Sequence, residues 1–433
     1  MKLRPFELAL VGIFLGLGLL ALVLLSSYKP KSDTPTVVLG TSVVIWGTLP
    51  AAAFKEVLDP LMEEIEEFRV VTYVEKDPRT FDLDLLKALA ENRGPDIIVL
   101  PHEKLVQQRS KIQAISYDNF PRRDFMDRYI DGAEIFALSD GIYAFPIAID
   151  PLVMYYNRDT LSNKNIINPP ATWEAVTSDI VPNLVERDYA HSIIRSPLAF
   201  GEYRNVQNGF AVLSMLLLQG GSTLVTEGES QYKVALNQSS SGNLLPFEKA
   251  VTFYTNFASP SNPLYSWNRA QNMDRDEFLS EDLALYFGLG SEARGIESKN
   301  PNLNFDIAEV PQGAEASVRR TYASFYGLAL LKSSRNIAGA YTVIQTLGSA
   351  ARAQLLSQSL GMAPAHRSTL LLGSNDKYGR ITYNSAKVAR AWLSPDATVT
   401  GTIFTDMVEN ILANRSRPSE AANDAVERLE AAY

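Results

Sequence analysis

One carboxylate stands in an unusual place in this sequence. Asp150 lies in the apolar segment GIYAFPIAIDPLVMYYN, between prolines at positions 146 and 151. Burying a carboxylate is costly unless another group binds it. An ionised carboxylate accepts hydrogen bonds from hydroxyl groups, so we expect Asp150 to contact a polar ligand. A salt bridge that fixes a hinge is the structural alternative.

Two further pairs of residues follow predicted strands. Trp46 and Thr48 lie at the end of the first β-rich run, and Glu103 and Lys104 follow the apolar run DIIVL. A parallel α/β fold exposes its ligand site at the ends of its strands. Thr48 is therefore a candidate ligand contact, whereas Trp46 fits a ligand face or the core equally well. A solvated surface pair is the alternative for Glu103 and Lys104.

Four more candidates are aromatic or lie before a helix. Gly290 and Ser291 lead into a predicted helix, whose first backbone N–H groups can hold an anion or a hydroxyl group. A plain glycine turn is the alternative there. Trp267 and Tyr326 are candidates to cover the apolar face of a sugar, although a structural role is the more common one for such residues.

Composition and motifs exclude several classes of protein. The chain has no cysteine, which excludes disulfides, thiolate metal sites and cysteine nucleophiles. Its three histidines form no H-E-x-x-H pair, and there is neither a G-x-S-x-G elbow nor a P-loop. A net charge of −9 argues against a nucleic-acid partner. We expect no cofactor and no metal. A carboxylate-dependent enzyme stays open, because paired acids leave no fixed local signature.

The elements that must position these residues alternate between strand and helix. Three β-rich runs alternate with two stretches of helical apolar spacing, at residues 37–46, 54–68, 69–74, 83–90 and 96–100. This order favours parallel pairing with crossover helices, hence an α/β fold. Proline is poorly tolerated inside a central strand. We therefore predict that the segment around Asp150 is extended but twice broken, as in a chain that crosses between two lobes.

The N-terminal region carries an unbroken apolar run at residues 8–25. As a helix it would span about 27 Å, close to the hydrocarbon thickness of a membrane. No small-residue cleavage site follows it, so we expect a retained transmembrane anchor rather than a cleaved signal peptide. Residues 1–7 precede this anchor and residues 26–35 follow it as a linker; the charges on its two sides leave its orientation open.

Several landmarks resemble the bacterial extracellular solute-binding proteins of the maltose-binding type, in that family's order. They are VIW at 44–46, GPDII at 94–98 with PHEK at 101–104, YAFPIA at 143–148 with YNRD at 156–159, NPPATWE at 168–174, LYFGLGS at 285–291 and GMAPA at 361–365. The resemblance implies a type II periplasmic-binding-protein-like fold with two α/β lobes, three crossings between them and a ligand in the cleft. It also implies an extracytoplasmic location, with residues 1–7 as a short cytoplasmic end, and an ABC-type permease partner.

The resemblance implies roles for individual residues as well. Glu103 and Lys104 match charged ligand-contacting positions of the family. Asn208 and Phe210 match the start of a helix that faces the cleft, although Phe210 fits the core equally well.

Lobe boundaries follow from the three implied crossings, near residues 145–150, 323–327 and 361–364. The first lobe then comprises residues 36–148 and 327–362, and the second comprises residues 149–326 and 363–433.

These features together predict a membrane-tethered binding protein, not an enzyme, that delivers a small ligand to an ABC importer. The residue types of the candidate site favour a carbohydrate. Leu100 and Ser291 stand where maltose binders place stacking tryptophans, which leaves the identity of the sugar open. A carboxylate-dependent carbohydrate-active enzyme and a ligand-sensing ectodomain for a separate membrane partner are the alternatives.

Overall fold

The computed structural model describes residues 39–221, 224–228, 232–236 and 246–433. The predicted cytoplasmic end (1–7), anchor (8–25) and linker (26–35) lie outside this part of the chain. Within the described residues, no helix is both long enough and apolar enough to cross a membrane.

The sheet begins with three parallel strands joined by helices. β1 (Val43–Gly47) lies between β2 (Val71–Glu75) and β3 (Ile97–Pro101), and the connections are α2 (Ala51–Glu64) and α3 (Phe81–Ala90). The predicted α/β order and parallel pairing are confirmed. Pro60 lies inside α2 rather than at its start.

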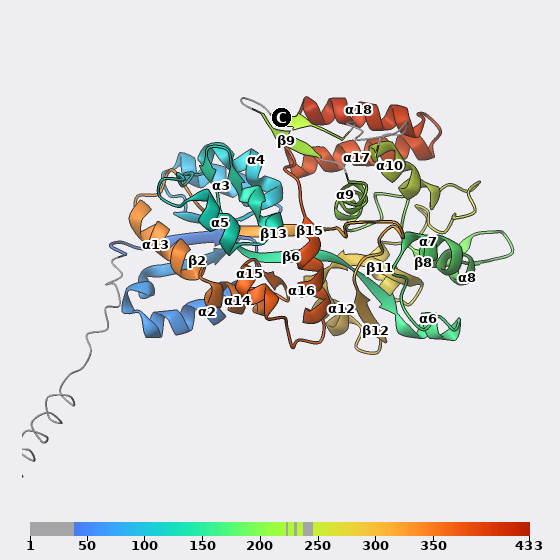
Figure 1. The fold of residues 1–433 in the computed structure, drawn as a ribbon, viewed down its shortest axis with the longest axis horizontal. Helices are drawn as coiled ribbons and strands as arrows, with labels where there is room; N and C mark the ends of the chain where they lie inside the picture. Colours follow the sequence, from blue (N-terminus) through green and yellow to red (C-terminus); the bar gives the residue numbers. More distant parts are fainter. Residues whose placement is uncertain (1–38, 222–223, 229–231, 237–245) are drawn as a thin grey trace, which may run out of the picture. The chain divides into compact units, whose positions relative to one another are not determined.

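Two long antiparallel strands, β6 (Phe145–Asn157) and β13 (Thr321–Leu330), run through the middle of the sheet (Figure 1). The described strands follow the order β2-β1-β3-β13-β6-β11-β8-β7, with β12 and β14 also pairing with β6, and β15 with β13. The bounds of these further strands are β7 (Glu186–Arg187), β8 (Ile193–Leu198), β11 (Leu283–Leu289), β12 (Phe305–Ala308), β14 (Ala363–Pro364) and β15 (Ala389–Arg390). Two short hairpins lie outside this sheet, formed by β4 (Ala137–Leu138) with β5 (Gly141–Ile142) and by β9 (Val225–Glu227) with β10 (Tyr232–Val234).

The expected break of the segment around Asp150 is wrong, because β6 is one continuous strand that contains both prolines. Pro146 stands opposite Gly327, beside an irregularity in the β13 register. Pro151 stands where β6 exchanges neighbours, since its pairing with β11 begins at Leu152. Each N–H in a strand points to one side only, so proline is tolerated where that side offers no ladder partner.

The three expected crossings lie side by side in this sheet. Ser324 of β13 stands opposite Asp150 of β6, and Ala363 of β14 stands opposite Ile149. The exact lobe boundaries remain a prediction.

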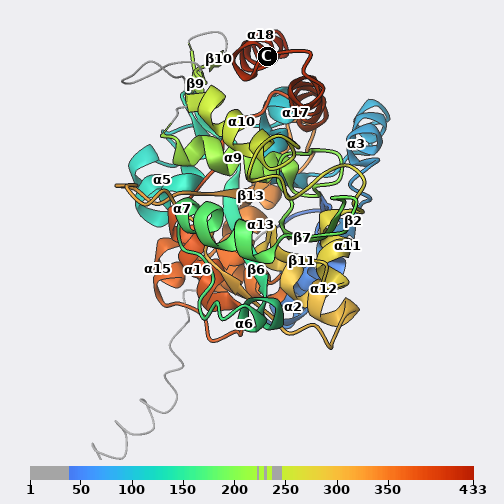
Figure 2. The ribbon, with the colours of Figure 1, turned by 90° about the vertical axis from the view of Figure 1, so that its right-hand side faces the viewer.

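Helices cover both faces of the central strands. α9 (Gly209–Gln219) and α10 (Pro246–Asn256) lie on one side of β6 and β13, and α16 (Gly379–Val388) lies on the other (Figures 1 and 2). The remaining described helices are α4 (Leu105–Gln108), α5 (Arg122–Arg128), α6 (Arg158–Asn163), α7 (Trp173–Ala175), α8 (Val181–Leu184), α11 (Asp274–Leu279), α12 (Ala293–Lys299), α13 (Ile337–Leu347), α14 (Ala350–Ser359), α15 (Arg367–Leu371), α17 (Ala397–Leu412) and α18 (Pro418–Glu430). One apolar core surrounds α9, and a second contains Trp267, Phe278 and Tyr286.

Candidate ligand-binding site

Asp150 and Ser291, two of the predicted site residues, are in direct contact. Asp150 is 1% exposed on β6. The backbone N–H of Ser291 donates to Oδ1 at 3.0 Å, and its hydroxyl donates to Oδ2 at 2.5 Å. Ser291 belongs to the short turn Gly290–Glu292, which follows β11 and precedes α12. The N–H expected to be free at this helix start is therefore used by a carboxylate of the same chain.

Burial raises the pKa of Asp150 to about 7. The two hydrogen bonds from Ser291 oppose this shift, whereas the charges of Glu292 and Glu103 add to it. Near neutral pH this carboxyl group is therefore partly protonated, and can donate as well as accept a hydrogen bond.

Glu103 is linked to Asp150 through β13. It lies in the short turn His102–Lys104 that follows β3. Its Oε1 accepts hydrogen bonds from the hydroxyls of Tyr322 at 2.6 Å and Ser324 at 2.5 Å. Glu103 therefore bonds the residue of β13 that stands opposite Asp150 in the sheet. We call Asp150, Ser291, Glu103, Tyr322 and Ser324 the carboxylate network.

His102 has a structural role beneath this network. It is fully buried, and its Nδ1 accepts the backbone N–H of Phe325 at 3.2 Å. Burial lowers its pKa, and the charge of Glu103 only partly offsets that effect. The ring is therefore neutral at physiological pH.

Three more predicted residues pack around the carboxylate network. Tyr326, half-buried, follows Ser324 by two residues and shares its face of β13; burial and then the charges of Glu103 and Asp150 raise its pKa. Phe210, in the first turn of α9, packs edge-on to Tyr322, with ring centroids 5.7 Å apart. Asn208 donates from Nδ2 to Oε1 of Glu292 at 2.9 Å, which fixes the residue next to Ser291.

Three predicted residues make no described hydrogen bond to the network. Lys104 donates to Oδ2 of Asp82 on α3 at 2.5 Å, so its charge is already paired. Trp46 lies at the end of β1, where Nζ of Lys76 stands 3.8 Å from the centre of its ring. Thr48 is half-buried just beyond this strand.

Trp267 and Gly290 have clear structural surroundings. Trp267 is fully buried, and its indole N–H donates to Oδ1 of Asn205 at 3.0 Å. The structure thus places this ring in the core, without a described contact to the carboxylate network. At Gly290, an added Cβ would stand 3.0 Å from side-chain atoms of Thr382, so the turn that carries Ser291 packs tightly against α16.

Sequence reasoning missed Tyr322 and Ser324, although a signal was present. Tyr322, Ser324 and Tyr326 alternate along β13 and therefore share one face of the strand. Their hydroxyl groups, with the carboxylates of Asp150 and Glu103, offer many hydrogen-bonding atoms in a small volume. Such a set suits a ligand with several hydroxyl groups. The described residues contain no cluster of three or more acidic, histidine or cysteine side chains that could hold a metal ion.

The fold is that of the type II α/β solute-binding proteins. The family model described as bacterial extracellular solute-binding protein matches residues 51–354, and the chain belongs to this family. A protein of Brucella abortus (strain 2308), named as a binding protein, is 23% identical over 327 residues, which cover 72% of this chain and 74% of the relative.

Solved structures of binding proteins share the fold at low sequence identity. A cyclo/maltodextrin-binding protein in complex with maltotetraose has a TM-score of 0.71 at 15% identity, over 90% of this chain and 96% of its own. A cyclic α-maltosyl-1,6-maltose-binding protein from Arthrobacter globiformis has a TM-score of 0.71 at 16% identity, over 90% of this chain and 98% of that protein. An ABC transporter solute-binding protein from Thermotoga lettingae TMO, bound with α-D-tagatose, has a TM-score of 0.65 at 18% identity, over 90% and 99%.

Proposed function

We propose that this protein binds a carbohydrate outside the cytoplasm and delivers it to the permease subunits of an ABC importer. The observation that carries the proposal is the carboxylate network, in which Asp150 and Glu103 meet hydroxyl groups at the crossing strands. Membership of the extracellular solute-binding family supports the location and the role. The carbohydrate ligands of the structures with the same fold support the ligand class.

In this proposal the sugar occupies the side of the crossing strands that carries Asp150, Glu103 and Tyr326. The carboxylates accept hydrogen bonds from sugar hydroxyls, each contributing about 1.5–3 kcal/mol. Tyr326 and Phe210 cover apolar sugar faces. The remaining proposed contacts are Trp46, Thr48, Lys104, Asn208, Gly290 and Ser291. Residues 8–25 hold the protein at the membrane.

A thermal-shift series on residues 33–433 tests the ligand class. The probes are maltotetraose, tagatose, glutamate and spermidine, each at a millimolar concentration. A sugar at 100 times its dissociation constant stabilises the native state by about 2.7 kcal/mol. Stabilisation by glutamate or spermidine, with neither sugar effective, would refute the carbohydrate class and leave the fold untouched.

The same sample separates a binding protein from a carboxylate-dependent enzyme. We expect maltotetraose to be recovered intact after prolonged incubation, as measured by chromatography of the sugar. Shortened products that disappear in Asp150→Asn would instead identify an enzyme.

A further inference from the structure

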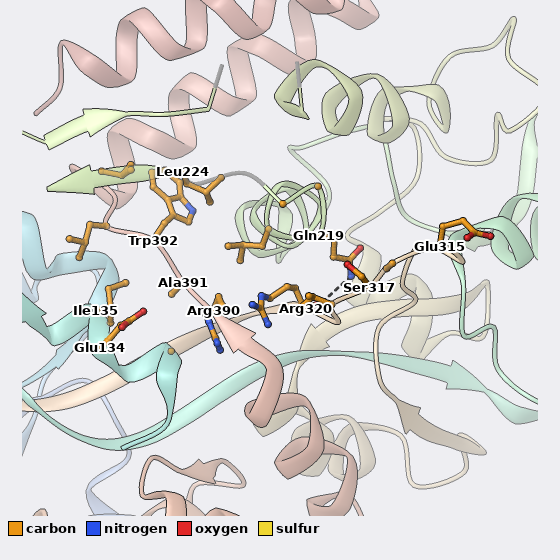
Figure 3. Close-up of a pocket in the computed structure, with 18 residues that line it drawn as sticks. Glu134, Ile135, Gln219, Leu224, Glu315, Ser317, Arg320, Arg390, Ala391 and Trp392 are labelled. Atoms are coloured by element: carbon orange, nitrogen blue, oxygen red, sulfur yellow. Dashed lines mark hydrogen bonds between the residues drawn. The ribbon is translucent and has the colours of Figure 1, made fainter. Parts of the chain in front are cut away.

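A cavity lies apart from the carboxylate network. Its volume is about 740 Å³, and it is bounded by the turn that contains Glu134, the end of α9, the segment before β13 and the segment after β15 (Figure 3). Asp150, Ser291 and Glu103 are not among the residues that line it. A cavity of this size can hold a small organic molecule.

One arginine in this cavity has a fixed backbone and spare donors. The backbone N–H of Arg320 donates to Oε1 of Gln312 at 2.9 Å, and its carbonyl accepts from Nε2 of Gln219 at 3.0 Å. The guanidinium donates only to the carbonyl of Arg319, at 3.2 Å. Among the described residues its other N–H groups have no acceptor. The side chain is thus held at its base while most of its donors remain available.

A second arginine lies next to it. Arg390 donates to Oδ2 of Asp131 at 3.0 Å, and Asp131 also binds Arg367. Burial, and then the charge of Arg320, lower the pKa of Arg390, and Figure 3 shows the two guanidinium groups side by side. Arg367 and Arg390 therefore share Asp131, whereas Arg320 makes no described ion pair.

The charged residues of the lining are Arg320, Arg390, Glu134 and Glu315. In Figure 3 the two arginines stand between Glu134 on one side and Glu315 on the other. A planar guanidinium with free donors binds carboxylate or phosphate oxygens well.

An apolar wall faces these arginines. Leu218, Leu224 and Trp392 line the cavity. The indole N–H of Trp392 already donates to Oγ of Ser214 at 2.9 Å, so this side chain offers the cavity only apolar surface. Charge at one end and apolar surface at the other suit a ligand with both properties.

We propose that this cavity binds a small organic anion, with its carboxylate or phosphate group at Arg320 and Arg390 and its apolar body against Leu218, Leu224 and Trp392. The site is separate from the carbohydrate site and does not depend on it.

Calorimetric titration of residues 33–433 with benzoate, phenyl phosphate and inorganic phosphate tests the site. We expect at least one of the two aromatic anions to bind, and Arg320→Gln to weaken that binding by about tenfold or more, which corresponds to about 1.4 kcal/mol. Arg319→Gln is the matched control, because this neighbouring arginine pairs with Glu309 and does not line the cavity. Its affinity should equal that of the unmodified protein.

Three results would overturn the proposal. The first is that neither aromatic anion binds at about 10 mM. The second is that Arg320→Gln and the unmodified protein bind the anion with equal affinity. The third is that inorganic phosphate binds as tightly as phenyl phosphate, because the apolar wall would then have no role. Preference for benzoate or for phenyl phosphate decides between a carboxylate and a phosphate ligand. Sugar binding, measured in the same Arg320→Gln sample, should be unchanged, so failure of this site is distinguishable from failure of the carbohydrate site.

Discussion

Replacing Asp150 by asparagine should stabilise the unliganded protein above neutral pH while weakening sugar binding. The side chain keeps its shape, its carbonyl can accept the N–H of Ser291, and its amide can donate to the Ser291 hydroxyl. What disappears is a buried negative charge. Stability and affinity therefore move in opposite directions if Asp150 serves ligand binding.

The size of the stability change follows from the pKa of Asp150. This pKa is about 7 in the native protein against an ordinary value of 3.8 for an aspartate, so the native state binds the proton more tightly than the unfolded state does. Ionisation of Asp150 therefore lowers the stability of the native protein. This penalty is absent below about pH 4, grows between about pH 4 and pH 7, and is complete above about pH 7. This difference of about three units in the pKa of Asp150 corresponds to a loss of roughly 4 kcal/mol in the free energy of unfolding.

Urea unfolding at pH 4.5 and pH 8 measures this effect. We expect Asp150→Asn to be more stable than the unmodified protein by about 1 kcal/mol at pH 4.5 and by roughly 4 kcal/mol at pH 8. Calorimetric titration at pH 8 with the sugar that gives the largest thermal shift should show affinity weakened about tenfold or more. If the stability gain appears but affinity is intact, Asp150 only braces the crossing strand and the proposed site is wrong.

Asp274 provides a matched control for this prediction. It is also 1% exposed, burial likewise raises its pKa to about 7, and its Oδ1 accepts the backbone N–H groups of Gln207 and Arg275. Asp274→Asn should therefore give the same pH-dependent stability gain. Because Asp274 does not touch the carboxylate network, its replacement should leave sugar affinity unchanged.

Three further predictions concern the anchor, the crossing strands and Ser291. The intact mass of the full chain extracted from membranes should include residues 8–25, and a mass that begins near residue 26 would show cleavage instead. Small-angle scattering should give a smaller radius of gyration with saturating sugar, because crossing strands can act as hinges; an identical profile would contradict closure. Ser291→Ala removes one hydrogen bond to the buried carboxylate of Asp150, so urea unfolding at pH 8 should show a loss of about 1.5–3 kcal/mol, and an unchanged midpoint would mean that this bond contributes little.

The sequence was most informative where local pattern decides structure. The apolar periodicity of α2 and the runs that became β1, β2 and β3 predicted parallel strands correctly. The placing of Asp150 in an apolar segment predicted a buried carboxylate that needs a partner.

The sequence was less informative where the partner is distant in the chain. Lys104 is neutralised by Asp82, which lies on another element, and no local pattern identifies such a pair. The burial of Trp267 depends on Asn205 and the second core. The prolines of β6 were misinterpreted because their tolerance depends on which neighbours the strand has at each position.

The pairing of β3 with β13 has a consequence for the timing of folding. Pro101 of β3 stands opposite Tyr326 of β13. β3 is therefore synthesised well before the strand with which it pairs. Contacts between segments so far apart in sequence form slowly, since a long loop must close first. The N-terminal strands thus remain without one edge of their sheet until most of the chain exists. We therefore expect these N-terminal strands to complete their folding together with the later part of the chain rather than before it.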